Sequence, residues 1–336
     1  MKNMKILKLS FLLLANSALA GNYANEVLSI GVGARALGMG GAFVALADDS
    51  TAVYWNPAAL PRVPHVEIAA IQQGREYSGL SLNEVGSRYM FLSGAMTVPT
   101  LGTFGGAFMR FGVDDIIQTS GAFNPDGSPV QVGTFSSDDF GVMLSYGRQF
   151  HPAFNAGLTL KYLSGGTSGL KAGSGVPGDA SYSYIGFDLG LISELGGLTP
   201  SLKGLSLGIN FQDALNTGIA WKNTPTSPTN AVDLNPKLGI AYTPVWDFLK
   251  NMDAKWSLAF DVDPKYSPNT LYHFGTEFWY KDTIGLRAGA RMFSGGGQGM
   301  ESSLGASFKL YIIEVDYAFI NYELTPIQYL SLAVKF

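Results

Sequence analysis

The chain has 336 residues, a formal charge of −4 at pH 7 and no cysteine. Charged residues make up 14% of it, against about 25% in typical soluble domains, whereas glycine is unusually frequent, with 42 residues. This composition excludes a basic face for nucleic acid, a disulfide framework and a lipid-anchored cysteine, and it suggests that much of the surface does not face water.

Residues 1–20 have the three parts of a secretory signal peptide. Basic residues precede an apolar stretch that runs to Leu14, and residues 18–20 (ALA) have the small-x-small pattern of a cleavage site. We therefore expect an exported protein whose mature chain begins at Gly21.

The sequence ADDSTAVYWNPAAL, residues 47–60, predicts a short capped helical turn. Asp48 and Asp49 are good N-cap residues, while Pro57 disfavours a helical conformation at Asn56. We therefore expect the turn to end near Asn56. The mature chain up to this point is rich in glycine and too short to form a domain of its own.

The mature chain offers no credible transmembrane helix. Its best uncharged window, residues 90–109, contains Pro99 and four glycines, which break a helix but suit a hairpin. Because lipid cannot satisfy the open edge of a sheet, a membrane-spanning chain without helices has to form a closed β-barrel.

Strict alternation of apolar and polar residues supports a barrel in the second half of the chain. It is clear in residues 254–263 (AKWSLAFDVD), 283–293 (TIGLRAGARMF) and 312–320 (IIEVDYAFI). Such period-two segments of about ten residues match a tilted membrane-crossing strand. The polar residues that we expect to face the lumen are Lys255, Asp261, Asp263, His273, Glu277, Arg287, Arg291, Glu314 and Asp316. Charges in a barrel interior most often cross-link the wall or hold a plug.

Fourteen strand-like segments can be placed along the chain. They are residues 65–72, 88–98, 102–112, 137–150, 153–163, 182–192, 204–213, 236–243, 254–263, 270–280, 283–293, 301–309, 311–321 and 326–336. Connections after odd-numbered segments are mostly long and polar, whereas several after even-numbered segments are short, which is typical of outer-membrane barrels. The longer connection 244–253 contains VWDFLKNM, which predicts a helical turn at the periplasmic rim.

The C-terminal sequence YLSLAVKF alternates up to Phe336 and resembles the final strand of bacterial outer-membrane proteins. With the signal peptide and the uneven connections, it favours an all-β transmembrane antiparallel barrel over residues 61–336, located in the cell outer membrane and in contact with its lipid. A soluble all-β sandwich or propeller explains the alternation but not the three features together.

The sequence GVGARALGMGGAFVALADDSTAVYWNPAAL, residues 31–60, resembles the N-terminal signature of the PorV/PorQ family, which is related more distantly to FadL-type long-chain fatty-acid channels. In FadL-type proteins this region is a plug inside a fourteen-stranded barrel, so the resemblance implies a plug, or hatch, over residues 21–60. The residues of the implied plug motif are Arg35, Gly38, Gly40, Gly41, Asp48, Asp49, Tyr54, Trp55, Asn56 and Pro57.

Facing and charge suggest how such a plug would be held. We expect Asp48 and Asp49 to bind donors on the inner wall. The candidate donors are Arg287 and Arg291, which share the lumen-facing register. The aromatic pair of the motif is expected to pack against the apolar part of the lumen.

The sequence supports an enzymatic function less well than a membrane barrel. GVGARA, at residues 31–36, mimics a dinucleotide-binding fingerprint, but no long helix and no parallel βαβ pattern follow. His273 could serve a barrel hydrolase, yet no recognisable motif positions a serine beside it. No Cys/His spacing supports a metal site. We therefore predict a protein that is not an enzyme and has no cofactor or metal.

Two functions of different class remain open. The FadL resemblance implies passive transport of a hydrophobic or amphipathic small-molecule ligand through an apolar luminal cavity. The closer PorV resemblance implies a structural or shuttle partner of the proteins of type IX secretion. We favour transport, for which a continuous apolar cavity would be the structural sign, whereas the secretion role calls for a protein-binding rim.

Overall fold

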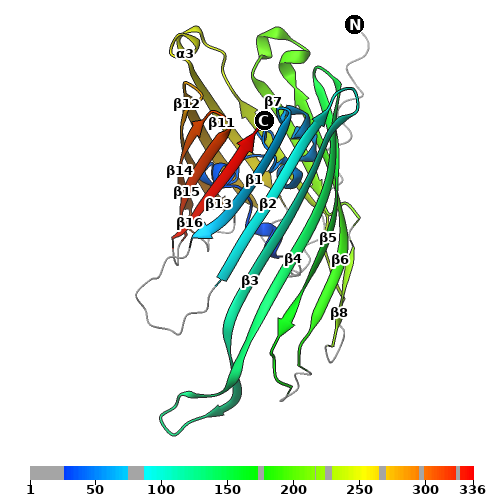
Figure 1. Cartoon of the computed structure of the whole chain (residues 1–336), viewed down its shortest axis with the longest axis vertical. Helices are drawn as coiled ribbons and strands as arrows, with labels where there is room; N and C mark the ends of the chain where they lie inside the picture. The colour runs from blue at the N-terminus through cyan, green and yellow to red at the C-terminus, as the bar shows by residue number, and fades with distance from the viewer. Residues whose placement is uncertain are drawn as a thin grey trace.

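The computed structural model describes residues 26–74, 87–172, 178–215, 217–223, 229–264, 270–294, 299–322 and 326–336. The expected signal peptide and the expected mature N-terminus at Gly21 lie outside these residues. Within the described ranges the chain forms sixteen strands, and all of them except β8 and β9 close into one antiparallel barrel of fourteen (Figure 1).

The barrel strands follow one another around the ring in chain order. They are β1 (Val66–Gly74), β2 (Ser87–Val98), β3 (Gly102–Phe123), β4 (Pro129–His151), β5 (Phe154–Ser168), β6 (Ser181–Glu194), β7 (Leu205–Gln212), β10 (Asn235–Tyr242), β11 (Ala254–Asp263), β12 (Leu271–Tyr280), β13 (Ile284–Phe293), β14 (Glu301–Leu310), β15 (Ile313–Asn321) and β16 (Ile327–Lys335). Pairing of β1 with β16 closes the ring, so the described barrel has no open edge.

The fourteen predicted segments all coincide with barrel strands, and the predicted all-β antiparallel barrel of fourteen strands is confirmed. The predicted helical turn in the connection 244–253 is also present, as α3 (Asp247–Asn251). Two predicted loops contain further strand. Residues 113–136 mostly extend the hairpin of β3 and β4, and residues 214–235 contain β8 (Gly218–Lys222) and β9 (Thr229–Ala231), which pair beside β6. The outer parts of β3 and β4 are largely exposed on both faces, so they lack the apolar alternation that marks a strand in sequence.

The two ends of the barrel differ. The connections between β2 and β3, β4 and β5, and β12 and β13 are tight turns at one end, which we call the turn end; α3 and the 3-10 turns η3 (Leu195–Gly197) and η4 (Pro200–Leu202) lie there too. At the opposite end, the loop end, β3 and β4 project well beyond their neighbours (Figure 1). Long connections at one end and short ones at the other are typical of outer-membrane barrels.

The outside of the wall is apolar. Along β13 and β14, Leu286 and Leu304 are 57% and 61% exposed, while Arg287 and Ser303 between them point inward and are buried. The same alternation holds along β11 and β15, as the sequence predicts. The structure contains no helix, among its described residues, that is long and apolar enough to span a bilayer.

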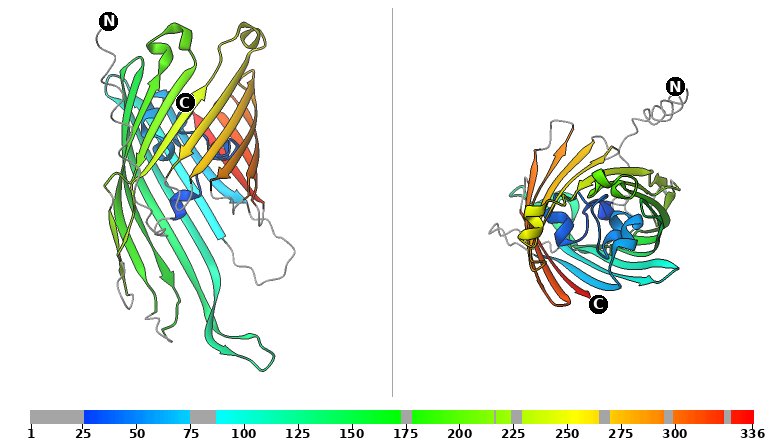
Figure 2. Two further views of the ribbon diagram at one scale, coloured as in Figure 1. Left: turned by 180° about the vertical axis from the view of Figure 1, so that it is seen from behind. Right: turned by 90° about the horizontal axis from the view of Figure 1, so that it is seen from above.

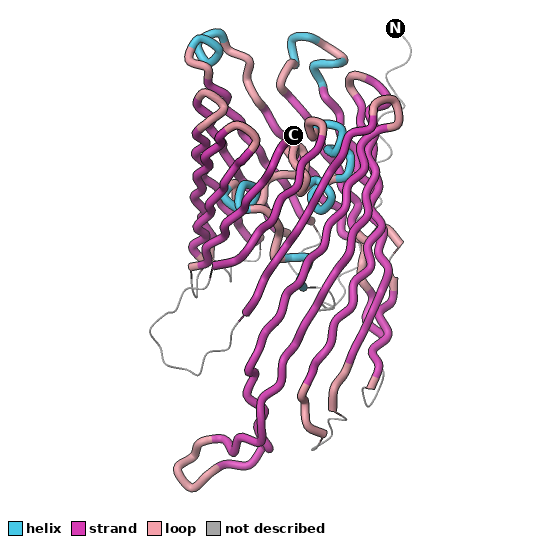
Figure 3. The backbone as a smooth tube through the Cα atoms, viewed as in Figure 1, coloured by secondary structure: helices cyan, strands magenta, loops and turns pink. Residues whose placement is uncertain are grey.

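The chain before β1 lies inside the ring. Residues 26–62, the N-terminal segment, contain η1 (Glu26–Ser29), α1 (Ala34–Gly38), α2 (Ala52–Trp55) and η2 (Pro57–Arg62), and the view along the barrel shows these turns within the circle of strands (Figure 2). Figure 3 shows the same helical turns in cyan, surrounded by strand. From residue 31 to residue 60 every residue except Asp48 is buried.

Glycines allow the segment to touch the wall directly. A Cβ on Gly289 of β13 would lie 2.1 Å from the Gly40 nitrogen, and one on Gly275 of β12 would lie 2.5 Å from the Met39 carbonyl oxygen. Gly40 itself has a φ of +67°, which favours glycine. The segment and the wall are therefore in backbone contact along β12 and β13.

The facing of β13 makes a testable prediction. Replacing Leu286 by Arg puts a charge on the apolar exterior, which should lower the free energy of unfolding by about 2–4 kcal/mol if the residue lies near a bilayer midplane. Lys255→Arg, on the luminal side of β11, should leave it almost unchanged. Urea unfolding from lipid vesicles measures both variants, and equal stability of Leu286→Arg and the parent would contradict an exterior in contact with lipid.

Candidate functional site

The N-terminal segment is held by polar side chains of the barrel wall. The backbone N–H groups of Phe43 and Val44 both donate to one carboxylate oxygen of Asp261, at 2.6 and 2.7 Å. The N–H of Ala34 donates to the Ser331 hydroxyl at 2.8 Å. Each of these luminal side chains thus satisfies backbone groups that have no strand or helix partner.

Similar contacts come from wall strands around most of the barrel. Ser303 contacts Gly38 and Gly40, His273 donates from Nδ1 to the Gly40 carbonyl, Tyr89 donates to Gly31, Thr159 to Val53, Asn210 to Trp55, Gln212 to Tyr54, and Ser206 to Ala45. A flexible tail that was only loosely held in the lumen would not form hydrogen bonds with side chains of so many strands. The segment is built into the barrel as an internal layer.

Arg35 is the centre of a buried ion-pair network between the segment and the wall. Its guanidinium forms a bidentate pair with Glu277 of β12, with both hydrogen bonds at 2.8 Å. Its third nitrogen contacts Asp48, and also Asp49 at 3.2 Å. Glu277 in turn accepts from Arg287 Nε at 2.5 Å. Arg35, Glu277 and Arg287 are only 7%, 1% and 4% exposed, so the network is shielded from solvent.

The electrostatic balance keeps Asp48 ionised. Burial by itself would raise the pKa of Asp48, but the charges of Arg35 and Lys255 outweigh burial and hold the pKa well below its ordinary value. Because a depressed pKa stabilises the folded state above the unfolded pKa of about 3.9, this contribution is present at neutral pH and is lost only as the pH falls through the lower folded value.

The predicted partners of the two aspartates are wrong. Arg287 pairs with Glu277 and with Asp316, and Arg291 pairs across strands with Glu301. From the wall, Lys255 of β11 lies 3.7 Å from Asp48, so a wall donor is present for that aspartate. The donor that reaches both aspartates is Arg35, from the same segment. It reaches them because α1 and the turn before α2 lie side by side, a tertiary contact that strand facing does not predict.

The local structure of the motif is as expected in most respects. Asp49 accepts a hydrogen bond from the N–H of Thr51 at 3.0 Å and so caps the turn, whereas Asp48 is committed to the ion pair. The helix α2 ends at Trp55, and the Asn56 side chain caps the following turn by accepting from Ala58 at 3.1 Å. The capping prediction thus holds for one aspartate of the pair.

The remaining motif residues pack the interior. Trp55 donates from its indole nitrogen to the Val32 carbonyl at 2.9 Å, Tyr54 donates to the Leu28 carbonyl, and the two rings meet edge to face. Gly38 lies against Gly305 of β14, Gly41 lies against His273, and Pro57 begins η2.

The other predicted luminal residues form separate pairs. Asp263 binds Lys237 at 3.1 Å, Glu314 binds Lys335 at 2.8 Å, and Lys255 lies 3.7 Å from Asp48. Sequence analysis missed Lys161, whose ammonium group contacts Asp188 at 2.8 Å and Asp213 at 2.9 Å. Alternation with Leu158, Leu160 and Tyr162 in β5 was the signal that places it inward.

The lumen differs on the two sides of the segment. Toward the loop end, buried apolar residues line the wall; they include Ile71, Tyr89, Phe91, Met109, Leu163, Tyr184 and Tyr329, and Leu28 of the segment belongs to the same cluster. Toward the turn end, a basin of about 610 Å³ is lined by charged residues, among them Arg35, Asp48, Lys255, Lys309, Glu314 and Lys335. The segment therefore lies between a buried apolar cluster and a charged basin, although the loop end also contains the largely buried ion pairs Lys237–Asp263 and Arg291–Glu301.

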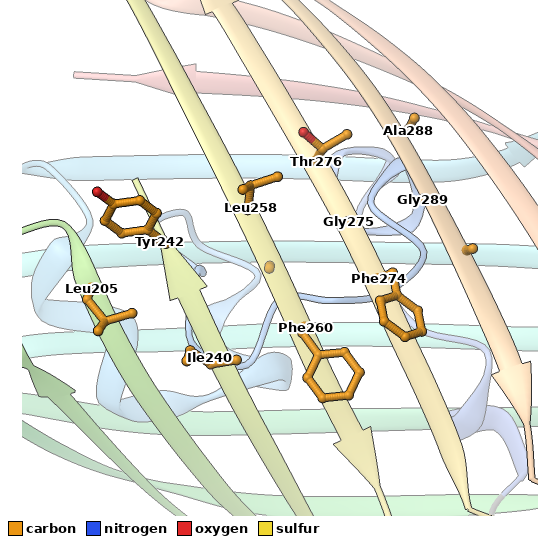
Figure 4. Close-up of a pocket in the computed structure, with 12 residues that line it drawn as sticks. Leu205, Ile240, Tyr242, Leu258, Phe260, Phe274, Gly275, Thr276, Ala288 and Gly289 are labelled. Carbon is orange, nitrogen blue, oxygen red and sulfur yellow. The ribbon is translucent and has the colours of Figure 1, made fainter. Parts of the chain in front are cut away.

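A second hollow lies on the outside of the wall. It has a volume of about 590 Å³, spans β7 and β10 to β13, and is lined mainly by Ile240, Leu258, Phe260, Phe274, Thr276 and Ala288 (Figure 4). We call it the outer groove.

Among the described residues, no three histidine, aspartate or glutamate side chains are grouped as a metal site would require.

The comparisons with known proteins concern the fold. Neither a protein-family model nor a curated protein sequence matches the chain. Solved structures do match: the Pseudomonas putida toluene transporter TodX, with a TM-score of 0.62 at 12% identity, covers 91% of this chain and 99% of its own. The Ralstonia pickettii toluene transporter TbuX, at 0.60 and 13%, covers 91% and 98%, and the monoaromatic hydrocarbon channel CymD, at 0.56 and 13%, covers the same shares. The chain thus has the fold of these hydrocarbon channels.

Arg35 provides the sharpest test of the network. Arg35→Ala leaves Glu277, Asp48 and Asp49 without their shared cation, and breaking a buried pair typically costs about 3–5 kcal/mol. We expect faster hydrogen exchange over residues 31–60, with barrel strands far from the network little affected. Arg88→Ala, which removes an exposed pair with Asp114, is the matched control and should change little. Unchanged exchange in Arg35→Ala would show that the network does not hold the segment.

Proposed function

We propose that this protein is an outer-membrane barrel for the passive transport of hydrophobic or amphipathic small molecules, exported by a signal peptide over residues 1–20. The observation that carries the proposal is a closed barrel that is apolar outside and holds an internal segment between a buried apolar cluster and a charged basin. The shared fold with channels described as toluene transporters agrees with a hydrophobic ligand.

The luminal arrangement supports an amphipathic route. A molecule that enters from the loop end meets the apolar cluster around Tyr89 and Tyr329, and one that leaves at the turn end passes charged groups around Lys255 and Lys335. An apolar environment followed by a polar one favours release into the aqueous periplasm.

In this proposal residues 21–60 act as a plug. The described part of the segment lies across the ring between the apolar cluster and the charged basin, so a molecule that crosses along the axis requires the segment to shift. The hydrogen bonds to Asp261 and Ser331 and the ion pairs of Arg35 would then be the contacts that exchange during passage. Their number predicts slow, gated passage rather than an open pore.

The alternative is a PorV-like role as a structural or shuttle component of type IX secretion. The similarity of Gly33–Leu60 to the PorV/PorQ signature favours it, and a firmly built-in segment suits a protein that stays closed. In that case ligand uptake is absent, and loss of the protein lowers export of secreted proteins. The experiment below separates the two functions.

A reversible lock tests the plug. The chain lacks cysteine, so Ala34→Cys with Ser331→Cys introduces the only thiols at two positions that are in hydrogen-bond contact. In proteoliposomes the oxidised pair should reduce uptake of a hydrophobic dye to the level of protein-free vesicles, and reductant should restore it. The single variant Ser331→Cys controls for the lost Ser331 hydroxyl, and the single variant Ala34→Cys controls for the added thiol on α1.

A deletion of residues 34–60 complements the lock. If the barrel still inserts, its permeability to the dye should rise because the segment no longer lies across the lumen. Dye uptake that neither the lock nor the deletion alters would exclude a plug. A defect in export of secreted proteins without any uptake by the parent would instead establish the secretion role.

A further inference from the structure

The outer groove is a depression in an otherwise bulky exterior. Two rows of outward-facing residues cross it, paired strand to strand: Tyr242, Leu258, Thr276 and Ala288 in the first, and Ile240, Phe260, Phe274 and Ala290 in the second. Side chains are large on β10 and β11 and small on β13. Beyond β13 the first row rises again at Leu304, which is 61% exposed. The groove therefore has two walls.

Internal packing does not explain the small outward residues. The inward positions on the same strands, Gly275 and Gly289, have to be glycine because the N-terminal segment touches them from inside. Ala288 and Ala290 point the other way, into the outer groove, where none of the described parts of the N-terminal segment lies. In Figure 4 the segment lies behind these strands while the labelled side chains line the near face. The depression is thus an independent feature of the exterior.

The chemistry of the groove fits a hydrocarbon chain and little else. Its side chains are aliphatic or aromatic apart from two hydroxyls, and the Thr276 hydroxyl already accepts a hydrogen bond from Trp256 Nε1 at 2.8 Å. No charged residue lines it. Its volume of about 590 Å³ lies in the range of about 300–1,000 Å³ found for small-molecule sites.

Aromatic residues mark one end of the groove as a membrane boundary. Trp256, which binds Thr276, has its ring centroid 6.0 Å from that of Trp246, and Trp246 stacks on Phe248 of α3 at 5.6 Å. All three belong to the turn end, and Lys250 of the same helix lines the charged basin instead. Tryptophan at this position is typical of the level of lipid headgroups.

We propose that the outer groove binds one acyl chain of a phospholipid of the periplasmic leaflet. This inference rests on the membrane embedding in the proposed function, but not on transport. Because lipid tails are as apolar as the groove, the hydrophobic effect does not favour one site over another, and selectivity comes from close packing of the chain between the two walls. The aromatic residues of the turn end would then lie beside the headgroup of the same lipid.

Filling the groove tests the proposal. The doubly substituted variant Ala288→Phe with Ala290→Phe occupies the floor, and Ala306→Phe, which faces outward on β14 outside the groove, is the matched control. Full-length protein is incubated with dipalmitoyl phosphatidylcholine in detergent, and bound lipid is measured by native mass spectrometry. We expect one retained lipid for the parent and for Ala306→Phe. For the filled variant retention should fall about tenfold, the loss expected from on the order of ten carbon–carbon contacts.

Three results would overturn the proposal. Equal retention by the filled variant and the parent would show that the groove holds no lipid, and an equal fall in Ala306→Phe would mean that only nonspecific annular lipid is measured. A fall in dye uptake in the filled variant with unchanged lipid retention would assign the groove to the transported molecule. Heat-modifiable migration on gels establishes that each variant is folded, and Ala290→Leu, a smaller filling, replaces the double variant if that one does not fold. Absence of dye uptake by the parent would contradict transport alone, because lipid retention is measured without it.

Discussion

The structure depends on one constraint: backbone N–H and C=O groups that are removed from water must find hydrogen-bond partners inside the protein. The wall meets this constraint by closing on itself through β1 and β16. The N-terminal segment cannot meet it in the same way, because it has irregular backbone and only short helical turns. Its groups are satisfied by side chains that the wall projects inward, which explains why a barrel with an apolar exterior has so polar a lining.

This requirement also accounts for the distribution of charge. Asp261 serves two backbone N–H groups at once, because one oxygen of its carboxyl group has lone pairs for both hydrogen bonds. Arg35 binds three carboxylates and needs them, since an unpaired buried guanidinium would be costly. Few charged residues are present in the chain, and a large share of those in the barrel point inward. The low charge content is therefore a consequence of an exterior without charges rather than of an interior without them.

The sequence predicted the wall far better than its contents. Each barrel strand has one buried polar face and one apolar outer face, and this produces the period-two pattern from which the strand positions were predicted. The tight turns indicate where several strands begin. The pattern fails where both faces are exposed, as in the outer parts of β3 and β4, since nothing there distinguishes one side from the other. Facing also placed Glu277 and Arg287 correctly in the lumen. Strand facing does not predict which luminal side chains form ion pairs with each other. A partner such as Arg35 belongs to a segment whose path across the barrel is determined by tertiary packing.

Glycines bring the N-terminal segment and the outer groove close to each other. Contact between the segment and β12 and β13 is so close that a single methyl group on Gly275 or Gly289 would collide with backbone. Where the inner surface is flattened in this way, one layer of backbone separates the segment from whatever lies outside. The outer groove is located over the same strands, so a change in the segment around Gly40 has only that layer through which to act on the groove. Closed strands resist such deformation because each is held on both sides by a continuous hydrogen-bond ladder, as β12 is between β11 and β13. The luminal segment and the exterior are thus separated, along β12 and β13, by a single layer of hydrogen-bonded backbone.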